Sequence, residues 1–329
     1  MVKLKLFDSL DAAAAAGADR LDREHGVDLF HRLDWFRLVA EHTPLARIAI
    51  LRAEIGDACA WLFLGIEGHT ARVLGNWYTL DYGPIFVAAD AQQQGALLNA
   101  LARGLRGLGA AQVELDPLTH ARAIGTALRR SGWLARPGQV SVRWVMPTQG
   151  LSFEDYWGAR PGQLRSTAAR KGKSAKLDIS IINHFDANAW SDYEQVYAGS
   201  WKPAEGSMPF LRALAQQEGA AGTLRLGIAR KDGRPIAAQL WLTEFGRATI
   251  HKLAYLSDAR ALSPGTLLGM AMFRHALDVD RVDAIDFGLG DDTYKRDWID
   301  RSEPVERLVA FDLLRPAGLA ALVGRLARR

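Results

Sequence analysis

Short apolar runs alternate with segments of helical spacing through the first 150 residues. Three runs in succession, 47–53, 59–66 and 70–74, are separated by turns that contain glycine. That pattern is typical of an antiparallel meander, because each short turn returns the chain beside the preceding strand. Leucines at helical spacing then predict a long helix over 91–108. The other elements expected here are a helix over 34–41, a strand over 112–115, a helix over 121–131 and a strand over 141–146.

The same order of elements returns after residue 150. The expected elements are a strand over 179–182, a helix over 187–198, strands over 224–229, 235–243 and 248–256, a helix from Ser263 to Leu277, and a strand over 282–287. The chain is therefore predicted to be an α/β (α+β) protein of two tandem units. Each unit would contain a mixed, mostly antiparallel, twisted sheet flanked by helices. We place the first domain at 1–150 and the second at 151–329.

Composition limits the class of protein. At 329 residues the chain can form two cores, and 49% hydrophobic with 24% charged residues is ordinary for a folded protein. The net charge of +4 permits an anionic partner but falls well short of a nucleic-acid-binding surface. The single cysteine, Cys59, excludes an internal disulfide framework and a cysteine-based zinc site. Scattered histidines without an HxxxH or HExxH pairing predict no metal site.

No targeting or membrane-spanning segment is evident. Asp8 and Asp11 interrupt the apolar stretch that a signal peptide needs. The longest uncharged apolar segment, 58–66, is much too short to cross a bilayer. Together with the lone cysteine in apolar surroundings, these features predict a cytoplasmic protein in a reducing compartment.

Two polar stretches of the second half are candidates for substrate binding. The stretch 159–176 holds six basic residues, among them Arg165 and Lys171. It is either a solvated helix face or a wall that binds an anion. The loop SWKPAEGS at 200–207 presents Trp201, Lys202 and Glu205, a combination that a connecting loop does not need for folding. The alternative is that Trp201 fills a gap between the domains.

The helix that begins at Ser263 has features of an anion site. Pro264 suits a first-turn position, Ser263 can cap the helix, and Gly265 lets a ligand approach the exposed N–H groups. Thr266 and Leu267 continue the same turn. We therefore treat this helix start as a candidate cradle for a phosphate or pyrophosphate. The alternative is an ordinary helix start, since Ser-Pro-Gly also begins many helices without a ligand.

Polar residues are most concentrated in the segment DFGLGDDTYKRDW, 286–298. A buried strand is expected to end at Asp286, and Asp291, Asp292, Tyr294 and Lys295 follow within a few positions. Loops at strand ends commonly carry functional sites. The two aspartates could instead cap the short helix that carries Tyr294.

One more titratable residue is expected near that segment. His251 lies in the neighbouring predicted strand, next to Lys252. It is either a group that faces the site or a satisfied core histidine. The strand that ends at Asp286 is expected to lie beside the strand that bears His251, with the helix start at 263–267 opening onto the same cleft.

The order of elements resembles the GNAT acetyltransferase fold, and two such units in tandem resemble the Fem family of peptidyl transferases. A closer likeness is to the CelD/BcsL-type GNAT-like acyltransferases, which are associated with cellulose and other envelope polysaccharide loci. Four stretches carry this resemblance: the basic segment 165–176, SWKPAEG at 200–206, LSPGTLL at 262–268 and GDDTYKRDW at 290–298. It covers most of 150–300, whereas 1–150 matches only in general layout.

The resemblance implies an acyl-CoA co-substrate and assigns roles to residues. It implies that 263–267 hold the donor pyrophosphate, although only Arg260 and Gly265 remain of the usual Arg/Gln-x-x-Gly-x-Gly/Ala signature. It also implies that Tyr294 protonates the leaving thiolate and that Lys295 stabilises charge at the reacting carbonyl. The first unit would then be a degenerate, structural or acceptor-binding domain, and the second the catalytic domain.

We expect direct transfer from the thioester to an amine of an envelope precursor, such as an amino sugar, a polysaccharide or a lipid. Candidates for the general base are Asp291, Asp292, His251 and Glu205. Two other classes remain open. One is a Fem-like transferase that takes an aminoacyl group from charged tRNA, which the modest net charge disfavours. The other is a non-catalytic binding module of an envelope assembly. Oligomeric state is not predicted.

The C-terminal segment 316–329 is predicted to be a basic helix. Leu319, Leu322, Val323 and Leu326 form one apolar stripe, and Arg325, Arg328 and Arg329 add positive charge. Such a helix suits peripheral contact with an anionic membrane, here the inner face. The alternative is a helix that docks on the core and has a basic end.

Overall fold

The computed structural model describes residues 1–329 except 27, 45–46, 119 and 328–329. The chain forms two compact units, Met1–Ser141 with Pro304–Arg329, and Val142–Glu303. The first break therefore lies close to the predicted boundary at residue 150. The division differs at the other end, because 304–329, which the sequence analysis placed in the second domain, belongs to the first unit. Arg328 and Arg329 lie outside the described residues.

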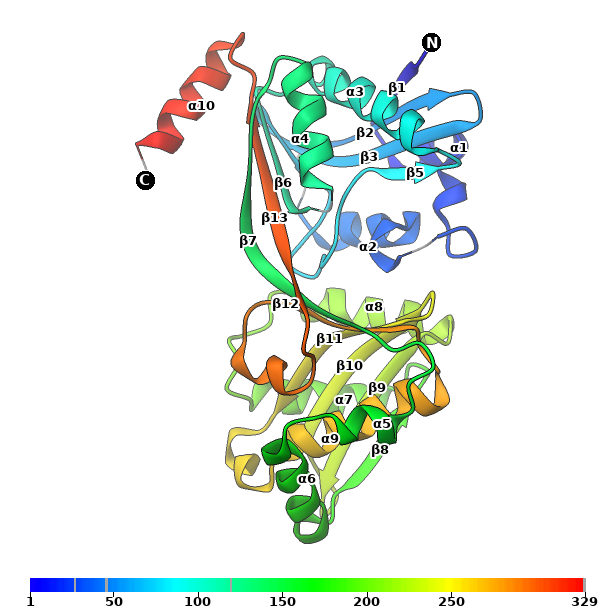
Figure 1. Cartoon of the computed structure of the whole chain (residues 1–329), viewed down its shortest axis with the longest axis vertical. Coiled ribbons are helices and arrows are strands. Elements are labelled where there is room, and N and C mark those ends of the chain that lie inside the picture. Colours follow the sequence, from blue (N-terminus) through cyan, green and yellow to red (C-terminus); the bar gives the residue numbers. More distant parts are fainter. Residues whose placement is uncertain (27, 45–46, 119, 328–329) are drawn as a thin grey trace. The chain divides into compact units, whose positions relative to one another are not determined.

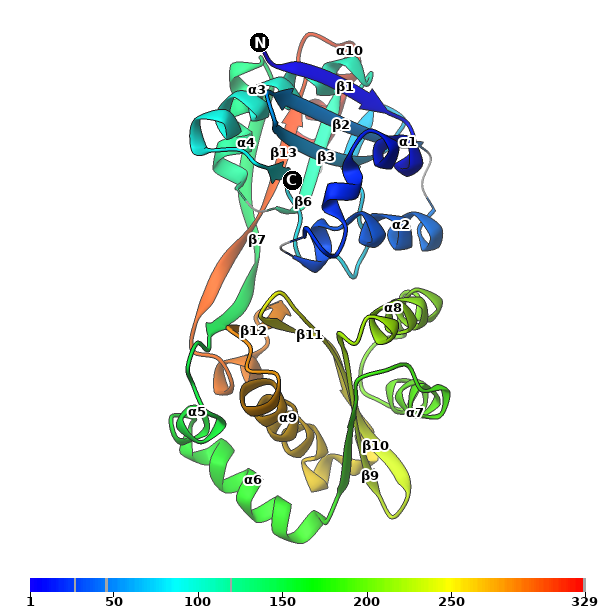
Figure 2. The same ribbon diagram turned by 90° about the vertical axis from the view of Figure 1, so that its right-hand side faces the viewer.

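The first unit is a mixed sheet with strand order β1-β2-β3-β4-β6-β13. Helices lie on both of its faces (Figures 1 and 2). Its elements are β1 Lys3–Phe7, α1 Leu10–Ala15, η1 Ala18–Leu21, η2 Leu29–His31, α2 Leu33–His42, β2 Arg47–Ile55, β3 Ala58–Glu67, β4 Thr70–Val73, β5 Ile85–Val87, α3 Ala91–Gly107, β6 Gln112–Leu118, α4 Ala121–Arg130, the first part of β7 Leu134–Pro147, β13 Ser302–Phe311 and α10 Pro316–Leu326.

The second unit repeats this plan with strand order β8-β9-β10-β11-β12-β7. Figure 2 shows α9 on one face of the sheet and α7 and α8 on the other. Its further elements are α5 Phe153–Gly158, α6 Gly162–Ala175, β8 Asp178–Ile182, α7 Ala187–Ala198, α8 Met208–Ala220, β9 Leu224–Lys231, β10 Arg234–Glu244, β11 Arg247–Tyr255, η3 Ser257–Leu262, α9 Pro264–Arg274, the π-helical turn η4 His275–Val279, β12 Ala284–Leu289 and η5 Thr293–Asp297.

These elements confirm the predicted fold class, a mixed α/β architecture with a mostly antiparallel sheet flanked by helices. The strand predicted to end at Asp286 does lie beside the one that bears His251, since β12 pairs with β11 in parallel register. The helix α8 was not predicted. The predicted helix from 263 to 277 ends earlier, at Arg274, and continues as the π-helical turn.

The parallel pair β11 and β12 separates after a short contact. Pairing extends only from Arg247–Ala284 to Thr249–Asp286. Just beyond it, the register of β11 against β10 shifts, so that Ile250 and Lys252 face successive residues of β10 and His251 is the extra residue of a bulge. The two strands are therefore joined at one end, and η5 follows the end of β12.

An aromatic core fixes η5 against the helices of the second unit. The Trp298 ring stacks on Phe273 of α9 at a centroid distance of 4.9 Å. Gly269 makes this approach possible, since a Cβ there would lie 3.0 Å from the Trp298 ring. The Trp298 carbonyl also accepts hydrogen bonds from Tyr156 Oη and Arg160 Nη1, each at 2.9 Å. The segment that carries Tyr294 is thus held at its C-terminal end by buried contacts.

Candidate functional site

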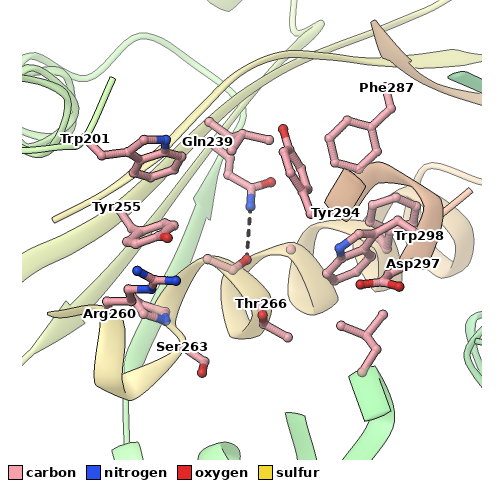
Figure 3. Close-up of a pocket in the computed structure, with 16 residues that line it drawn as sticks. Trp201, Gln239, Tyr255, Arg260, Ser263, Thr266, Phe287, Tyr294, Asp297 and Trp298 are labelled. Atoms are coloured by element: carbon pink, nitrogen blue, oxygen red, sulfur yellow. Dashed lines mark hydrogen bonds between the residues drawn. The ribbon is translucent and has the colours of Figure 1, made fainter. Parts of the chain in front are cut away.

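A pocket of about 340 Å³ opens in the second unit. Its walls come from β10 and β11, the loop after α7, the first turns of α9, and the segment from β12 through η5 (Figure 3). The predicted helix start and the predicted segment 286–298 therefore do meet at one cavity. Residues far apart in the sequence line it together, with Trp201, Arg260 and Tyr294 among them.

The first turn of α9 forms one end of this pocket. Ser263 takes a left-handed conformation, with φ of 52°, and its side chain makes no capping hydrogen bond, so the predicted cap is wrong. Its carbonyl instead accepts from the backbone N–H groups of Thr266 and Leu267, at 3.1 and 3.2 Å. Pro264 has no N–H. Among the described residues, the Gly265 N–H has no acceptor and remains available to a ligand.

Leu267 differs from its predicted place in the site. Ser263, Gly265 and Thr266 line the pocket, whereas Leu267 does not and is buried in the core. A helix presents only one side of its first turn to a cavity, and Leu267 lies on the other side. Its backbone N–H is also committed to Ser263, so Leu267 is not placed to bind a ligand in this arrangement.

A cation and a fixed amide border this helix start. Arg260 of η3 lines the pocket, and its guanidinium makes no hydrogen bond or ion pair with the described residues. The Gln239 side chain donates to the Gly265 carbonyl at 3.5 Å, and Trp241 Nε1 donates to the Gln239 oxygen at 2.9 Å. The positive end of the α9 dipole, an unpaired arginine and one open N–H thus converge where an anion could bind.

Tyr294 lies at the other end of the pocket, where the prediction put it. The ring packs edge-on against Phe287 with centroids 5.7 Å apart, and the hydroxyl points toward the sheet (Figure 3). Burial, helped by the nearby Asp292 carboxylate, raises the pKa of the Tyr294 phenol above its usual value. The phenol therefore keeps its proton at neutral pH and can donate it.

Lys295 points away from the pocket although it is the next residue. Its ammonium donates to the carbonyls of Leu289 at 2.5 Å and Gly290 at 3.4 Å, and it lies 3.5 Å from Asp292. Burial lowers the pKa of this lysine, and the Asp292 carboxylate opposes the shift. An ammonium has three protons, so these three acceptors account for all of them. Through these hydrogen bonds Lys295 holds η5 against the end of β12.

The carboxylate in the pocket wall is Asp297, which sequence reasoning passed over. Asp297 is exposed, lines the pocket and makes no hydrogen bond or ion pair with the described residues. The predicted Asp291 is instead held by Arg296 through two contacts of 3.0 Å. Asp292 occupies the N-cap position of η5 without a side-chain capping bond, so the alternative capping role is not observed either.

The loop after α7 places Trp201, Lys202 and Glu205 in different surroundings. Trp201 lines the pocket and packs on Tyr255, with centroids 4.2 Å apart. Glu205 forms a buried ion pair with Lys252 at 3.1 Å. Burial, together with the repulsion of Lys252, lowers the pKa of Lys202 to about 8, and Asp292 and Glu205 partly offset this shift. Lys202 therefore lies within electrostatic reach of the residues that flank Tyr294.

His251 is a buried residue of the bulge and does not line the pocket, so of the two alternatives the structure supports the core position and not the one facing the cleft. Burial and the adjacent Lys252 lower the pKa of this histidine to about 3, which keeps it neutral. The extra residue of the bulge changes the direction of the side chains that follow, and sequence alternation alone gives no sign of it.

The basic stretch forms α6, whose arginines and lysines are mostly exposed. Only Leu164 of this helix lines the pocket. Arg165 Nε donates to the Arg160 carbonyl at 3.0 Å, and Lys171 Nζ donates to the Ala261 carbonyl at 2.5 Å. Lys171 thus fixes the loop that carries Arg260, and neither Arg165 nor Lys171 contacts the cavity.

Two features are absent from the described residues. Within the described residues, no group of three or more His, Cys, Asp or Glu side chains is arranged to hold a metal ion. In the same part of the chain, no helix is both long and apolar enough to span a membrane.

Comparison with known proteins agrees with this architecture. Residues 163–296 match the family model described as an acetyltransferase (GNAT) domain. FemX has a similar structure at 10% identity, with 95% of this chain and 98% of FemX covered and a TM-score of 0.64. So does the C-terminal domain of a putative lysylphosphatidylglycerol synthetase from Agrobacterium fabrum, at 15% identity, 80% and 83% coverage and a TM-score of 0.55.

A third similar structure is a tandem GNAT protein from the clavulanic acid biosynthesis pathway. It shares 13% identity over 94% of this chain and 98% of its own, with a TM-score of 0.53. At these identities the likeness concerns the fold alone. A search of curated protein sequences finds no match. Residues 163–296 of the second unit thus match a GNAT-type acetyltransferase domain, in a chain whose fold is shared with tandem GNAT-like structures.

Proposed function

We propose that the protein is an acyl-CoA-dependent N-acyltransferase and that the pocket of the second unit is its active site. The observation that carries this proposal is that a single cavity has an anion-binding end and a proton-donating end. Arg260 and the Gly265 N–H lie at the first, and Tyr294 lies at the second. A volume of about 340 Å³ is within the usual range for small-molecule sites.

The anion-binding end suits a phosphate group of the donor. The free guanidinium of Arg260 can form charge-assisted hydrogen bonds with phosphate oxygens. The Gly265 N–H adds a donor at the positive end of the α9 dipole. The acyl-CoA donor supplies a thioester, and a phosphate held at the helix start leaves its acyl end free to extend toward Tyr294.

The reaction requires one proton to leave the amine and one to reach the sulfur. As the amine nitrogen attacks the thioester carbon, the new carbon–nitrogen bond replaces the carbon–sulfur bond. Tyr294 gives its proton to the departing thiolate, since its raised pKa keeps the phenol protonated. Lys202 follows Trp201 of the pocket wall but does not itself line the pocket; with a pKa of about 8, it can accept the amine proton when it is neutral and the acceptor extends to it. Asp297 is the second candidate for that role.

The acceptor is an amine of an envelope precursor, such as an amino sugar, a polysaccharide or a lipid. The resemblance of four stretches of the second half to CelD/BcsL-type acyltransferases supports this class. The loop with Trp201, Lys202 and Glu205 reaches the pocket through Trp201 and is the candidate for holding the acceptor. Most likeness to those proteins lies in 150–300, the region that also contains the pocket.

Native mass spectrometry with acetyl-CoA and long-chain acyl-CoAs tests the donor. We expect a CoA adduct that weakens in Arg260→Gln and persists in Arg212→Gln, whose arginine lies on α8, across the sheet from α9. Tyr294→Phe should keep the adduct but lose roughly 10²–10⁴-fold in transfer rate. If no acyl-CoA binds, or if Tyr294→Phe is as active as the unaltered protein, the proposal is wrong.

A Fem-like transferase with an aminoacyl-tRNA donor is a second candidate. The specific observation in its favour is that the Ser263 carbonyl accepts hydrogen bonds from the N–H groups of Thr266 and Leu267. Fewer N–H donors are therefore left for a pyrophosphate. The exposed basic face of α6 would then contact RNA. Retention of charged tRNA together with absence of a CoA adduct would favour this function over the first.

A further inference from the structure

The C-terminal helix α10 is fixed to the first unit at its start. Asp312, just before the helix, is buried and accepts from Arg106 at 3.0 and 3.2 Å. Gly318 packs so closely that a Cβ there would lie 2.1 Å from the Asp312 carbonyl oxygen. Of the residues of α10, only Gly318 is buried. The core of the first unit therefore anchors one end of the helix, whose ribbon runs beside the sheet (Figure 1). Five of the eleven residues of α10 are exposed.

Those uncovered side chains are largely apolar. Leu319, Val323 and Leu326 are 48%, 64% and 54% exposed. Their spacing of four and three residues places them on one face of the helix. We call these three residues the apolar stripe. The core does not cover these three residues, whereas Leu322, the fourth residue predicted for the stripe, is part-buried and lines a pocket beside the sheet. A contiguous exposed apolar face usually meets a partner.

A second feature lies between α10 and the sheet. A pocket of about 270 Å³ has apolar walls that include Phe311 of β13 and Leu322 of α10, and it is bordered by Arg136, Arg307 and Arg325. We call these three residues the arginine rim. Arg325 lies 3.1 Å from Glu114 and Arg307 lies 4.0 Å from Asp116.

The charge around this pocket is positive on balance. Arg136 makes no hydrogen bond or ion pair with the described residues. From Leu313 to Arg329 the sequence contains four arginines and no acidic residue. An arginine that has no partner in the described part of the chain, at the edge of a cavity lined by both apolar side chains and arginines, suits a ligand that is anionic at one end and apolar at the other.

We propose that the apolar stripe and the arginine rim together bind the surface of a membrane that contains anionic phospholipids. The stripe would insert among the acyl chains, and a headgroup phosphate would lie at the rim. An amphipathic helix of this kind lies in the plane of the interface, and each arginine near an anionic surface adds to binding. RNA would satisfy the arginines but leave the apolar stripe exposed. A second copy of this chain would bring like charges together.

Flotation of the full-length protein with vesicles tests this proposal. We expect binding to vesicles of phosphatidylglycerol and phosphatidylcholine, and at least fivefold less binding to vesicles of phosphatidylcholine alone. Binding to the mixed vesicles should fall as the salt concentration rises, because salt screens the charges. Equal binding to both kinds of vesicle, or binding to neither, would overturn the proposal.

Matched variants separate the two features. Val323→Glu should abolish flotation, whereas Val279→Glu, at a valine that is also 64% exposed but lies in the second unit, should leave it unchanged. Arg136→Gln should weaken binding about fivefold, and Arg103→Gln, on α3, should not. If the Val323→Glu protein still floats with the vesicles, the stripe does not bind lipid. The same conclusion follows if the only effect of Val323→Glu is to convert a dimer, seen by light scattering, into monomers. The proposal would also be refuted if the protein bound RNA and not vesicles, and if Arg136→Gln abolished that RNA binding.

Discussion

The two units have the same strand order, but the helix that crosses between their parallel strands begins differently in each. In the first unit, α3 connects to β6, which pairs in parallel with β4, and Asp90 caps its start. The Asp90 carboxylate accepts from the Gln93 N–H at 2.8 Å, and the Gln93 side chain accepts from the Asp90 N–H at 2.9 Å. A carboxylate of the chain thus occupies the positive end of that helix.

The corresponding helix of the second unit, α9, carries no such cap. Ser263 leaves the Gly265 N–H open, Arg260 beside it has no partner among the described residues, and the pocket begins there. One topology therefore supports a helix start closed by its own acid and one left open to a ligand. If the second unit binds an anionic donor as proposed, side-chain chemistry at the helix start, and not the fold, would decide which unit binds it.

The largest expected effect concerns the proposed catalytic residues of the second unit. Lys202→Met should lower transfer roughly 10²–10⁴-fold. Because a base must be neutral and the pKa of Lys202 is about 8, kcat/KM of the unaltered enzyme should rise with pH up to about 8 and then level. Lys202→Met should lose that rise. The measurement is kcat/KM against pH for both proteins with the same amine.

Two controls make this result specific. Lys173→Met alters an exposed lysine of α6 and should preserve the pH profile. Asp297→Asn should also preserve the rise toward pH 8. If Asp297→Asn removes activity while Lys202→Met does not, Asp297 is the base and our assignment of Lys202 fails.

The next largest effect is expected when the start of α9 is given an acidic residue, like the one that caps α3 in the first unit. Ser263→Asp places a carboxylate at the start of α9, where it opposes an anionic donor. We expect the KM for the donor to rise at least about tenfold, since a hydrogen bond to a charged group contributes about 1.5–3 kcal/mol. The same change at Ser207, the N-cap of α8, should leave KM unaltered. An unchanged KM in Ser263→Asp would mean that the donor does not bind at this helix start.

The sequence predicts the order of elements well but the direction of side chains poorly. Periodicity locates β9 to β12 and α9, and adjacency in the chain makes their pairing foreseeable. It misses α8, and it places β13 in the wrong unit, because β13 pairs with β6 across nearly 200 residues of sequence. Long-range pairing of this kind has no local signal.

The site shows the same limit. Tyr294, Ser263, Gly265 and Arg260 were predicted and do line one pocket, since motif chemistry marks them. Other residues of the same motifs do not line the pocket. Lys295, for example, donates hydrogen bonds to the backbone carbonyls of Leu289 and Gly290. Asp297 shares a turn of η5 with Tyr294 and faces the pocket with it. In a tight turn, three residues bring a side chain back to the same side. Asp291 is also three residues from Tyr294 but precedes η5, so spacing alone does not choose between the two aspartates.

A smaller effect is expected in the first unit, where Asp90 caps α3. Asp90→Ala removes the cap of α3 and should lower the free energy of unfolding by about 1 kcal/mol, as seen for other N-caps. Asp90→Ser should retain most of that stability because serine also caps. Chemical denaturation measures both. Donor KM should stay constant in each variant, and a rise in KM in Asp90→Ala would mean that the first unit takes part in donor binding after all.

The smallest expected effect comes from adding one methyl group to the open helix start. A Cβ on Gly265 would lie 3.1 Å from the Tyr255 ring, so the ring must shift by a few tenths of an ångström toward Trp201, on which it packs. We therefore expect Gly265→Ala to raise donor KM only a few-fold. Gly95→Ala in α3 is the matched change, because no atom lies within 4 Å of its Cβ position. That variant should gain up to about 1 kcal/mol of stability through helix propensity and keep the KM. If Gly265→Ala instead gains stability without altering KM, its N–H does not contact the donor, and the distinction between an open and a closed helix start has no functional meaning.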